Sequence, residues 1–392
     1  MLIRLKLTKT HFLKPLIMKK KLLLFTTCCL TALFSFGQVP TSERDALIAF
    51  YNATDGANWT DNTSWNTADP VSTWSGVTVE IVAGQDHVTG LVMSNNNLNG
   101  TLPLEIGDLL EIREIDLSFH PLLTGSIPAT IGNLTFLEAL SFWDNNLTGT
   151  IPPEMGNLTT LEVLSLEDNL LTGNIPTEFS NLTSMVSFWI NGNYFSGDIP
   201  DIFSNWTDLF FFSIGNSNLT PGPSNNFTGD LDLSNNTALS LCWVDHTLIS
   251  SLNIQNGNNS SITNFWYYAI ETPNLTCVFV DDVAFSNTTW EETDPGSTFV
   301  ANVAACEALS ISKDTLAQYM SLYPNPTSGI LNMKNNSNTT IENVTIINTI
   351  GQKVMETQIG NKIDISSLTE GMYFVNVKTL NGEITTFKIL KK

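Results

Sequence analysis

The stretch LEVLSLEDNLLTGNIP, residues 161–176, recurs along the chain with almost unchanged spacing. The clearest marker of each copy is a glycine that is followed three residues later by a proline. These glycines are Gly100, Gly125, Gly149, Gly173 and Gly197. A period of 24 or 25 residues is typical of a solenoid, in which each unit buries its apolar side chains only by stacking on its neighbours. The repeat therefore predicts an extended surface rather than a catalytic domain.

Three apolar columns stand before the asparagine of each unit, at eight, five and three residues upstream. In residues 161–176 they are Leu161, Leu164 and Leu166, and across six units every one of these positions is apolar. The last two columns lie two residues apart, as on one face of a strand, so each unit is predicted to contribute a short strand. We expect the asparagine to hydrogen-bond main-chain groups where the strand turns, with His120 in its place in the second unit and Ser217 in the sixth.

Residues 161–176 match the plant-type consensus of the leucine-rich repeat family column for column, so the chain resembles that family. The resemblance implies a leucine-rich repeat solenoid with a curved parallel β-sheet on its concave side and 3₁₀ or irregular segments on its convex side. A predicted helix over 43–51 and the tryptophans that follow it are similar to the helical N-terminal cap of such proteins, which covers the first apolar edge of the stack. The repeats become irregular from the sixth unit on, where the strand over 209–216 is kept but the next glycine comes late, at Gly229. We assign residues 38–87 to the cap, 88–283 to the solenoid and 284–319 to a C-terminal cap and linker.

The first 37 residues have the features of a secretory signal. They hold seven Lys or Arg residues and no acidic one, and an apolar run over 22–34 follows the lysines at 19–21. This run is too short to span a membrane. The pattern predicts a signal peptide over 1–37 and no transmembrane segment in the mature chain, and both Met1 and Met18 fit as its first residue.

Without that segment the chain carries ten basic side chains against 38 acidic ones. Such an excess of negative charge argues against a nucleic-acid partner and is common in soluble exported proteins. Three cysteines remain, Cys242, Cys277 and Cys306. Cys277 and Cys306 are candidates for a disulfide that ties the last repeat to its cap; the alternative is that Cys277 only fills an apolar column of the repeat.

The composition changes again near residue 320, where strands alternate with turns rich in proline and glycine. This pattern predicts a small antiparallel β-sandwich over 320–392. The motifs at 323–326 (YPNP), 351–354 (GQKV) and 368–373 (LTEGMY), together with the final two lysines, resemble the type A sorting domain of the type IX secretion system of Bacteroidota. The resemblance implies export by that machinery, followed by release or attachment at the cell surface, with or without cleavage of the domain.

Catalytic chemistry has little support in the sequence. The mature chain contains His87, His120 and His246, and none of them lies in a metal-binding, nucleophile or phosphate-binding motif. His120 stands in the asparagine column, where we expect it to serve as a turn residue. We therefore expect no enzyme, no cofactor and no metal site.

The candidate binding surface is the concave face, because side chains between the inward columns must point outward. Seven of thirty such positions are acidic and five are aromatic, while Arg113 is the only basic one. The candidate ligand-binding residues are Glu114, Asp116, Phe119, Glu138, Trp143, Asp144, Glu162, Glu167, Asp168, Trp189 and Phe211.

Crowded carboxylates beside aromatic rings favour a ligand that brings positive charge, such as a basic protein, an amine-bearing glycan or Ca²⁺; the alternative is solvation by counterions alone. The leading hypothesis is a non-enzymatic extracellular or cell-surface protein that binds a protein or glycan through this face. A structural or adhesive surface protein, and a protein inhibitor of an extracellular enzyme, are the alternatives.

Overall fold

The computed structural model describes residues 38–216, 224–262, 267–290, 293–309, 319–335, 340–349, 351–357, 362–380 and 384–392. The predicted signal peptide over 1–37 lies outside these ranges, as does Ser217. The buried apolar side chains form two separate clusters, one within residues 39–299 and one within residues 320–389. The first belongs to the repeat solenoid with its caps and the second to a C-terminal domain.

An N-terminal cap precedes the repeats. It contains α2 (Thr41–Ala53), η2 (Gly56–Asn58), η3 (Val71–Thr73), β1 (Val77–Val82) and β2 (Gln85–Val92). The helix predicted over 43–51 is thereby confirmed. The buried carboxylate of Glu43 accepts a hydrogen bond from the main-chain N of Val88 at 2.8 Å and contacts Nδ1 of His87 at 2.6 Å. These contacts join α2 to the first sheet of the solenoid.

The concave sheet takes one short strand from each unit and has the order β1-β2-β4-β6-β8-β10-β12-β14-β16. After the β1–β2 hairpin all of its strands are parallel. They are β4 (Glu114–Asp116), β6 (Ala139–Ser141), β8 (Val163–Ser165), β10 (Ser187–Trp189), β12 (Phe211–Ser213), β14 (Leu241–Trp243) and β16 (Tyr267–Tyr268). Ile115, Leu140 and Leu164 pair across neighbouring strands and are completely buried. The predicted inward column is therefore confirmed.

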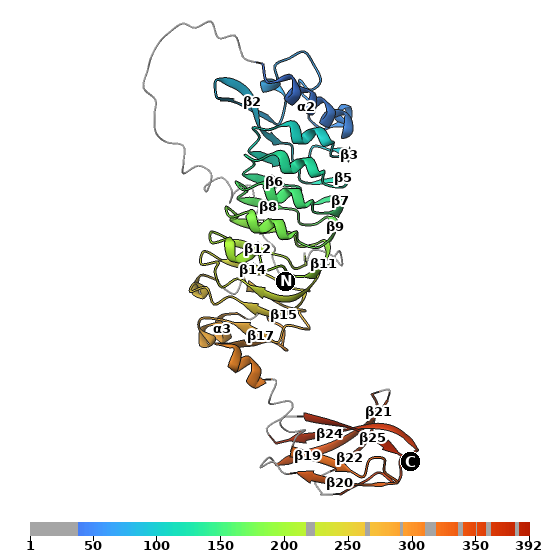
Figure 1. Cartoon of the computed structure of the whole chain (residues 1–392). Coiled ribbons are helices and arrows are strands. Elements are labelled where there is room, and N and C mark those ends of the chain that lie inside the picture. The colour runs from blue at the N-terminus through green and yellow to red at the C-terminus, as the bar shows by residue number, and fades with distance from the viewer. Residues whose placement is uncertain are drawn as a thin grey trace. The chain divides into compact units, whose positions relative to one another are not determined.

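A second parallel sheet, which the three apolar columns do not predict, runs along the opposite side of the coil (Figure 1). Its strands are β3 (Asn99–Thr101), β5 (His120–Gly125), β7 (Asn145–Thr150), β9 (Leu170–Gly173), β11 (Tyr194–Asp198), β13 (Asn226–Asp232), β15 (Leu248–Asn253), β17 (Cys277–Phe279) and β18 (Thr298–Val300). Side chains alternate along each strand: Leu147 and Leu171 are buried, whereas Thr148 and Thr172 are exposed. This alternation after the asparagine is the signal in the sequence for a second strand per unit.

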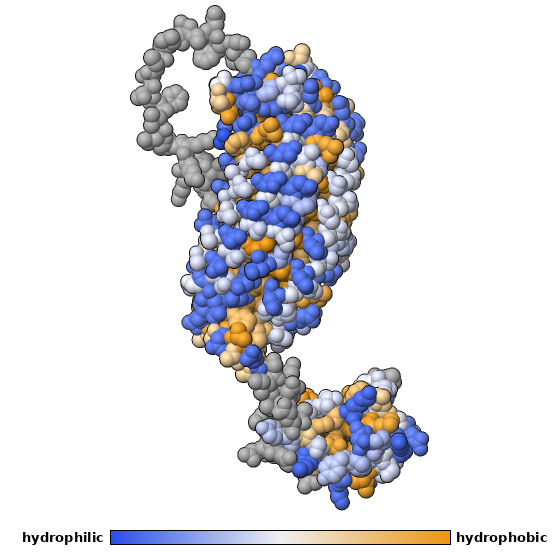
Figure 2. Space-filling view, viewed as in Figure 1, coloured by the Kyte–Doolittle hydropathy of each residue, from blue (hydrophilic) through white to orange (hydrophobic). Residues whose placement is uncertain are grey.

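Short 3₁₀ helices complete most turns of the coil, and all but the last of them follow the proline of the repeat. They are η4 (Leu104–Asp108), η5 (Ala129–Asn133), η6 (Pro153–Asn157), η7 (Thr177–Asn181), η8 (Phe203–Asn205) and η9 (Asn259–Ser261). They stack closely, since a Cβ on Gly156 would lie 2.6 Å from the main-chain O of Glu178. These helices confirm the predicted 3₁₀ convex side, on which hydrophilic side chains form repeated rows (Figure 2).

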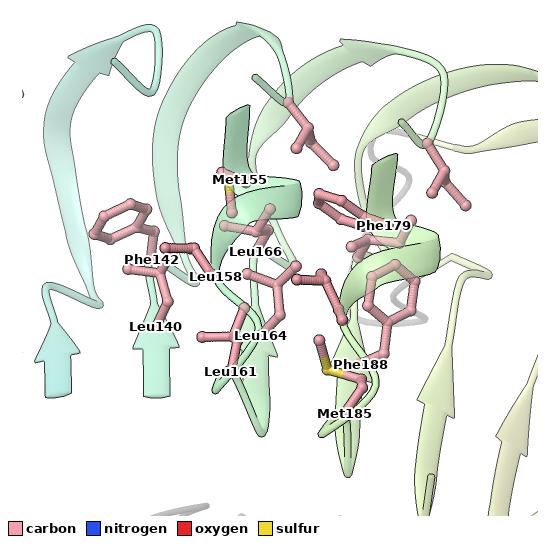
Figure 3. Close-up of a cluster of buried hydrophobic side chains, with 14 of the residues drawn as sticks. Leu140, Phe142, Met155, Leu158, Leu161, Leu164, Leu166, Phe179, Met185 and Phe188 are labelled. Atoms are coloured by element: carbon pink, nitrogen blue, oxygen red, sulfur yellow. The ribbon is translucent and has the colours of Figure 1, made fainter. Parts of the chain in front are cut away.

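The interior between the sheets is filled by the apolar columns (Figure 3). Leu161, Leu164 and Leu166 have no exposed surface, and neither have Leu140 and Phe188 from the neighbouring turns. Each such side chain contributes roughly 1.5–3 kcal/mol through burial, and it does so only while the adjacent turns are present.

The C-terminal end of the solenoid is closed by α3 (Val283–Thr289) and a helix at 303–309. A disulfide joins Cys277 of β17 to Cys306 of that helix, with a Cα–Cα distance of 5.9 Å. Cys242 is fully buried, and burial raises the pKa of its thiol to about 12, so it stays protonated and unreactive.

The C-terminal domain consists of two antiparallel sheets, as the sequence predicts. A three-stranded sheet contains β19 (Met320–Tyr323), β20 (Ile330–Asn335) and β23 (Lys362–Asp364). A four-stranded sheet has the order β22 (Lys353–Thr357), β21 (Ile341–Asn348), β24 (Gly371–Thr379) and β25 (Ile384–Lys391). Leu331 and Met333 of the first sheet share a buried cluster with Val344 and Val375 of the second.

Candidate functional site

The concave face is built by ladders of main-chain hydrogen bonds between equivalent residues of successive units. The N of Glu138 donates to the O of Arg113, and the N of Glu162 donates to the O of Glu138, both at 2.8 Å. The same column continues through Val186 to Phe210. Each unit therefore places its outward side chains beside those of the next unit, at a spacing of about 4.8 Å.

The first half of this face is acidic. We call Glu114, Asp116, Glu138, Asp144, Glu162 and Asp168 the acidic half. Glu114, Glu138 and Asp144 are exposed, and the other three are half-buried. Neighbouring groups partly desolvate the carboxylate of Glu114, and this desolvation, together with the negative charges of Asp116 and Glu138, raises its pKa. Partial desolvation also raises the pKa of Asp144, although both side chains keep contact with solvent. An added positive charge here would therefore be stabilised by carboxylates that are incompletely solvated.

Serine hydroxyls hold one of these carboxylates in place. Asp116 accepts hydrogen bonds from Oγ of Ser94 at 2.8 Å and from Oγ of Ser118 at 2.6 Å. Such contacts fix the direction of the carboxylate without neutralising its charge.

The prediction that Glu167 is exposed on this face is wrong. Its side chain is only 4% exposed, and its Oε2 accepts a hydrogen bond from Oγ of Ser165 at 2.6 Å. Because the strand curves into a turn at this position, the carboxylate is covered and does not belong to the acidic half.

The second half of the face is aromatic. We call Trp189, Phe210, Phe211 and Trp243 the aromatic half. The ring centroids of Trp189 and Trp243 lie 5.7 Å apart, over the small Ser213 that pairs with both residues in the sheet. Phe211 lies 5.8 Å from Trp189 and 4.6 Å from Phe210. The rings are half-buried or exposed, so each presents part of its surface to solvent.

Trp243 is absent from the predicted set because it lies after the last regular repeat. The signal was present in the sequence, since Leu239, Cys242 and Val244 stand eight, five and three residues before Thr247. Thr247 occupies the asparagine column, and its Oγ1 donates to the O of Val244 at 2.7 Å. The remaining predicted aromatic residues, Phe119 and Trp143, form a separate pair in units two and three with ring centroids 3.8 Å apart.

The asparagines of the repeat lie at the junction between the two sheets and are buried. Nδ2 of Asn169 donates to the O of Phe142 and to the O of Leu166, while its Oδ1 accepts from the N of Leu147. This is the turn role that the repeat predicts. In the sixth unit Asn225 makes these contacts, donating to the O of Ile214 at 2.8 Å. Ser217, which the repeat spacing predicts for this role, lies outside the described residues.

His120 fills the same role in the second unit with an imidazole. Its Nδ1 accepts from the N of Leu98 at 3.3 Å and its Nε2 donates to the O of Met93 at 2.9 Å, which requires the neutral ring. Burial lowers its pKa from 6.5 to about 4, in agreement with that assignment. His120 is thus a turn residue, as predicted.

The other two histidines contact carboxylates. His87 pairs with Glu43 in the cap, and His246 lies between Asp245 at 2.9 Å and Glu271 at 3.0 Å. The hydroxyl of Ser224 donates to the main-chain O of His246 and not to its ring. In the described residues, no group of three or more His, Cys, Asp or Glu side chains has the arrangement of a metal site.

Over the ranges that the structure describes, none of the helices has both the length and the apolar character needed to cross a bilayer.

Two protein families match parts of the chain. Residues 321–392 match the family described as Secretion system C-terminal sorting domain. Residues 87–109, 136–158 and 160–182 match the family described as Leucine Rich Repeat.

Similar proteins come from plants. The chain is 38% identical over 78 residues to Leucine-rich repeat protein FLOR 1 of Arabidopsis thaliana, which is 20% of this chain and 23% of that protein. It is 36% identical over 84 residues to a probable leucine-rich repeat receptor-like protein kinase of Arabidopsis thaliana, covering 21% of this chain and 8% of the kinase. The chain therefore spans less than a quarter of the length of either relative.

Solved structures with some similarity include a plant ice-binding protein, with 22% identity, a TM-score of 0.48, and coverage of 67% of this chain and 78% of that one. Another is the leucine-rich repeat ectodomain of the receptor kinase SOBIR1 from Arabidopsis thaliana. It has 27% identity, a TM-score of 0.40, and coverage of 48% of this chain and 99% of that one.

Proposed function

We propose that this chain, a leucine-rich repeat protein with a secretion system C-terminal sorting domain, is a non-enzymatic binding protein that works outside the cell. The sorting domain marks a protein exported by the type IX system and then released or attached at the surface. The repeats supply a rigid scaffold for a binding face, and the contacts of its three mature-chain histidines are accounted for by the fold.

The ligand that fits this face is a protein or glycan that carries positive charge. The observation that carries the proposal is the crowding of the acidic half, in which Asp116 and Glu138 help to raise the pKa of Glu114. A cationic group bound there relieves the repulsion between these carboxylates, and the attraction also speeds encounter.

The aromatic half supplies the apolar part of the same contact. Trp189 and Trp243 present partly exposed rings two strands apart, and aromatic side chains in such positions are frequent hot spots of binding. The ligand is therefore expected to be oriented, with its positive charge over units two to four and its apolar groups over units five to seven.

Affinity capture with matched charge reversals tests this proposal. The test variant is Glu138→Lys with Glu162→Lys, and the control is Glu154→Lys with Glu178→Lys, which makes the same change in the same two units on the exposed 3₁₀ helices. Both full-length proteins are immobilised and exposed to material from the surroundings of the producing cell, and the captured species are identified by mass spectrometry.

We expect the test variant to lose roughly tenfold or more of the specific capture, while the control retains it. Equal capture by both variants would reject the acidic half as the binding site.

A further inference from the structure

The C-terminal domain differs in charge from the rest of the mature chain. Residues 38–320 contain 33 acidic and 3 basic side chains, whereas residues 321–392 contain 5 acidic and 7 basic ones. A partner of this domain therefore meets a surface quite unlike that of the solenoid.

One sheet face of this domain carries neighbouring apolar side chains. Along β24, Tyr373 and Val375 point into the core, so Met372 and Phe374 point away from it. Met372 pairs with Leu390 of β25, and the two side chains are 39% and 40% exposed.

The same face continues across the sheet. Phe374 pairs with Lys388 on one side and with Ile347 of β21 on the other. We call Ile347, Met372, Phe374 and Leu390 the outer apolar patch. Lys388 borders it, is exposed, and forms no ion pair with any described residue.

The outward positions of the three-stranded sheet are mixed: Ile330 and Tyr323 are about half exposed, and the others are polar. Ser321 pairs there with Lys334, and Asn332 pairs with Tyr323 and with Lys362. The outer apolar patch is thus a property of the four-stranded sheet, and neighbouring exposed apolar side chains on so small a domain mark a site of interaction.

The loop that contains Asn325 and Thr327 holds β25, the strand that carries Leu390 of this patch. Oδ1 of Asn325 accepts from the N of Leu390 at 2.9 Å, and its Nδ2 donates to the O of Lys388 at 2.8 Å. The N of Thr327 donates to the O of Leu390 at 2.9 Å, and its O accepts from the N of Lys392 at 2.8 Å. The loop therefore occupies main-chain groups along the outer edge of β25 and fixes the position of Leu390.

We propose that the outer apolar patch is the surface through which a protein component of the export machinery docks on this domain, and that Asn325 and Thr327 are positioning residues for it. The occupant follows from two observations. The domain matches a sorting-domain family, so the export machinery is its partner, and Lys388, which forms no ion pair within the described part of the chain, fits an apolar protein groove with an acidic border. The inference does not depend on the ligand of the concave face.

The test measures export of the full-length chain from cells that contain a type IX system. The test variant is Met372→Ser with Leu390→Ser. The control is Ile330→Ser with Leu380→Ser, which changes two apolar side chains of the same domain that are 50% and 65% exposed. Thermal unfolding of the purified proteins shows whether each variant is folded.

We expect the exported fraction of the test variant to fall roughly tenfold, with unfolding unchanged, while the control is exported normally. Normal export of a folded test variant would overturn the proposal. The charge-reversed Glu138→Lys, Glu162→Lys chain should still be exported, so failure of this inference and failure of the proposed ligand site are distinguishable.

A photo-crosslinker at position 372 identifies the class of partner. The proposal expects a protein adduct that disappears in cells without the export machinery. Adducts with lipid alone would overturn it, because they would make the patch a membrane-contacting surface.

The positioning role is tested at Asn325. Asn325→Ala removes both side-chain contacts with β25, whereas Asn325→Asp keeps the acceptor for the N of Leu390. We expect Asn325→Ala to lower both export and the protection of the Leu390 amide against hydrogen exchange, and Asn325→Asp to restore part of each. Loss of export with unchanged protection at Leu390 would contradict the positioning role.

Discussion

The two sheets of the solenoid are made from the same repeat, yet their outward positions behave differently. On the second sheet one exposed column keeps the same kind of side chain from unit to unit: Asn99, Thr124, Thr148, Thr172 and Ser196. On the concave sheet the equivalent column changes at each step: Glu114, Ala139, Val163, Ser187 and Phe211.

The difference shows which positions of the repeat are free to vary in sequence. Interior columns are limited by packing, and the column before the repeat glycine on the second sheet stays small and polar, although Leu122 and Tyr194 on the same face are 50% and 49% exposed. The concave positions need only fit a short strand, and they vary most in charge. Information about a ligand is therefore to be sought on the concave sheet.

The largest expected effect is on the interior that both sheets share. Leu164→Ala removes a completely buried side chain and should lower the free energy of unfolding by about 4 kcal/mol. Val163→Ala, at the neighbouring half-buried outward position, should cost less than about 1 kcal/mol. Denaturant unfolding measures both, and equal losses would contradict the assigned inward and outward faces.

The second-largest effect on stability is expected for the buried asparagines at the junction of the two sheets, which we call the asparagine ladder. Asn169→Ala leaves main-chain groups of Phe142, Leu166 and Leu147 without their buried partner. We expect a loss of about 3 kcal/mol in the free energy of unfolding. The exposed Asn146 serves as the control, since Asn146→Ala should change stability by no more than about 0.5 kcal/mol. A neutral Asn169→Ala would show that the ladder does not hold the sheets together.

Because of His120, the free energy of unfolding should depend on pH. Its pKa is about 4 in the folded chain against 6.5 without burial, so the unfolded chain binds more protons between these values, and stability falls as the pH drops from 6.5 to 4. At pH 5 the loss amounts to about 2 kcal/mol.

His120→Asn introduces the residue that most other units carry and removes this titration. The stability of the variant relative to the original chain should rise by about 2 kcal/mol between pH 7.5 and pH 5, as measured by urea unfolding. A constant difference between the two proteins would mean that His120 is not held neutral.

The smallest effects on stability are expected at the outward positions. Substitutions there should distinguish the two sheets by their effect on ligand capture. Thr148→Ala on the second sheet and Glu138→Gln on the concave sheet should each change the free energy of unfolding by less than about 0.5 kcal/mol. Only Glu138→Gln should weaken ligand capture. Weaker capture by Thr148→Ala would show that the ligand binds to the second sheet.

Much of the interior could be predicted from the sequence because its rule is periodic. Leu161, Leu164 and Leu166 repeat at fixed offsets, and all of them are buried. The three apolar columns before the asparagine do not specify the second sheet, because its signal is the alternation of buried and exposed residues after the asparagine, as in Leu147 and Thr148.

The candidate site was harder to predict, because outward positions follow no period. Alternation alone places Glu167 in solvent, yet the turn after β8 buries it against Ser165. Trp243 is not in the predicted set because the irregular sixth unit shifts the register before it, although Leu239, Cys242 and Val244 keep the spacing of the apolar columns. Its pairing with Ser213 places it on the face. Side-chain burial at the end of a strand depends on the path of the turn, which the spacing of apolar residues does not specify.

Carboxylate footprinting tests the central claim most directly. A carbodiimide label is applied to the full-length chain with and without its captured ligand, and the modification of Glu138 and Glu162 is compared with that of Glu154 and Glu178 in the same two units. The account predicts that the ligand protects Glu138 and Glu162 and leaves Glu154 and Glu178 unchanged. Protection of Glu154 and Glu178 alone, or of neither pair, would contradict recognition through the concave sheet.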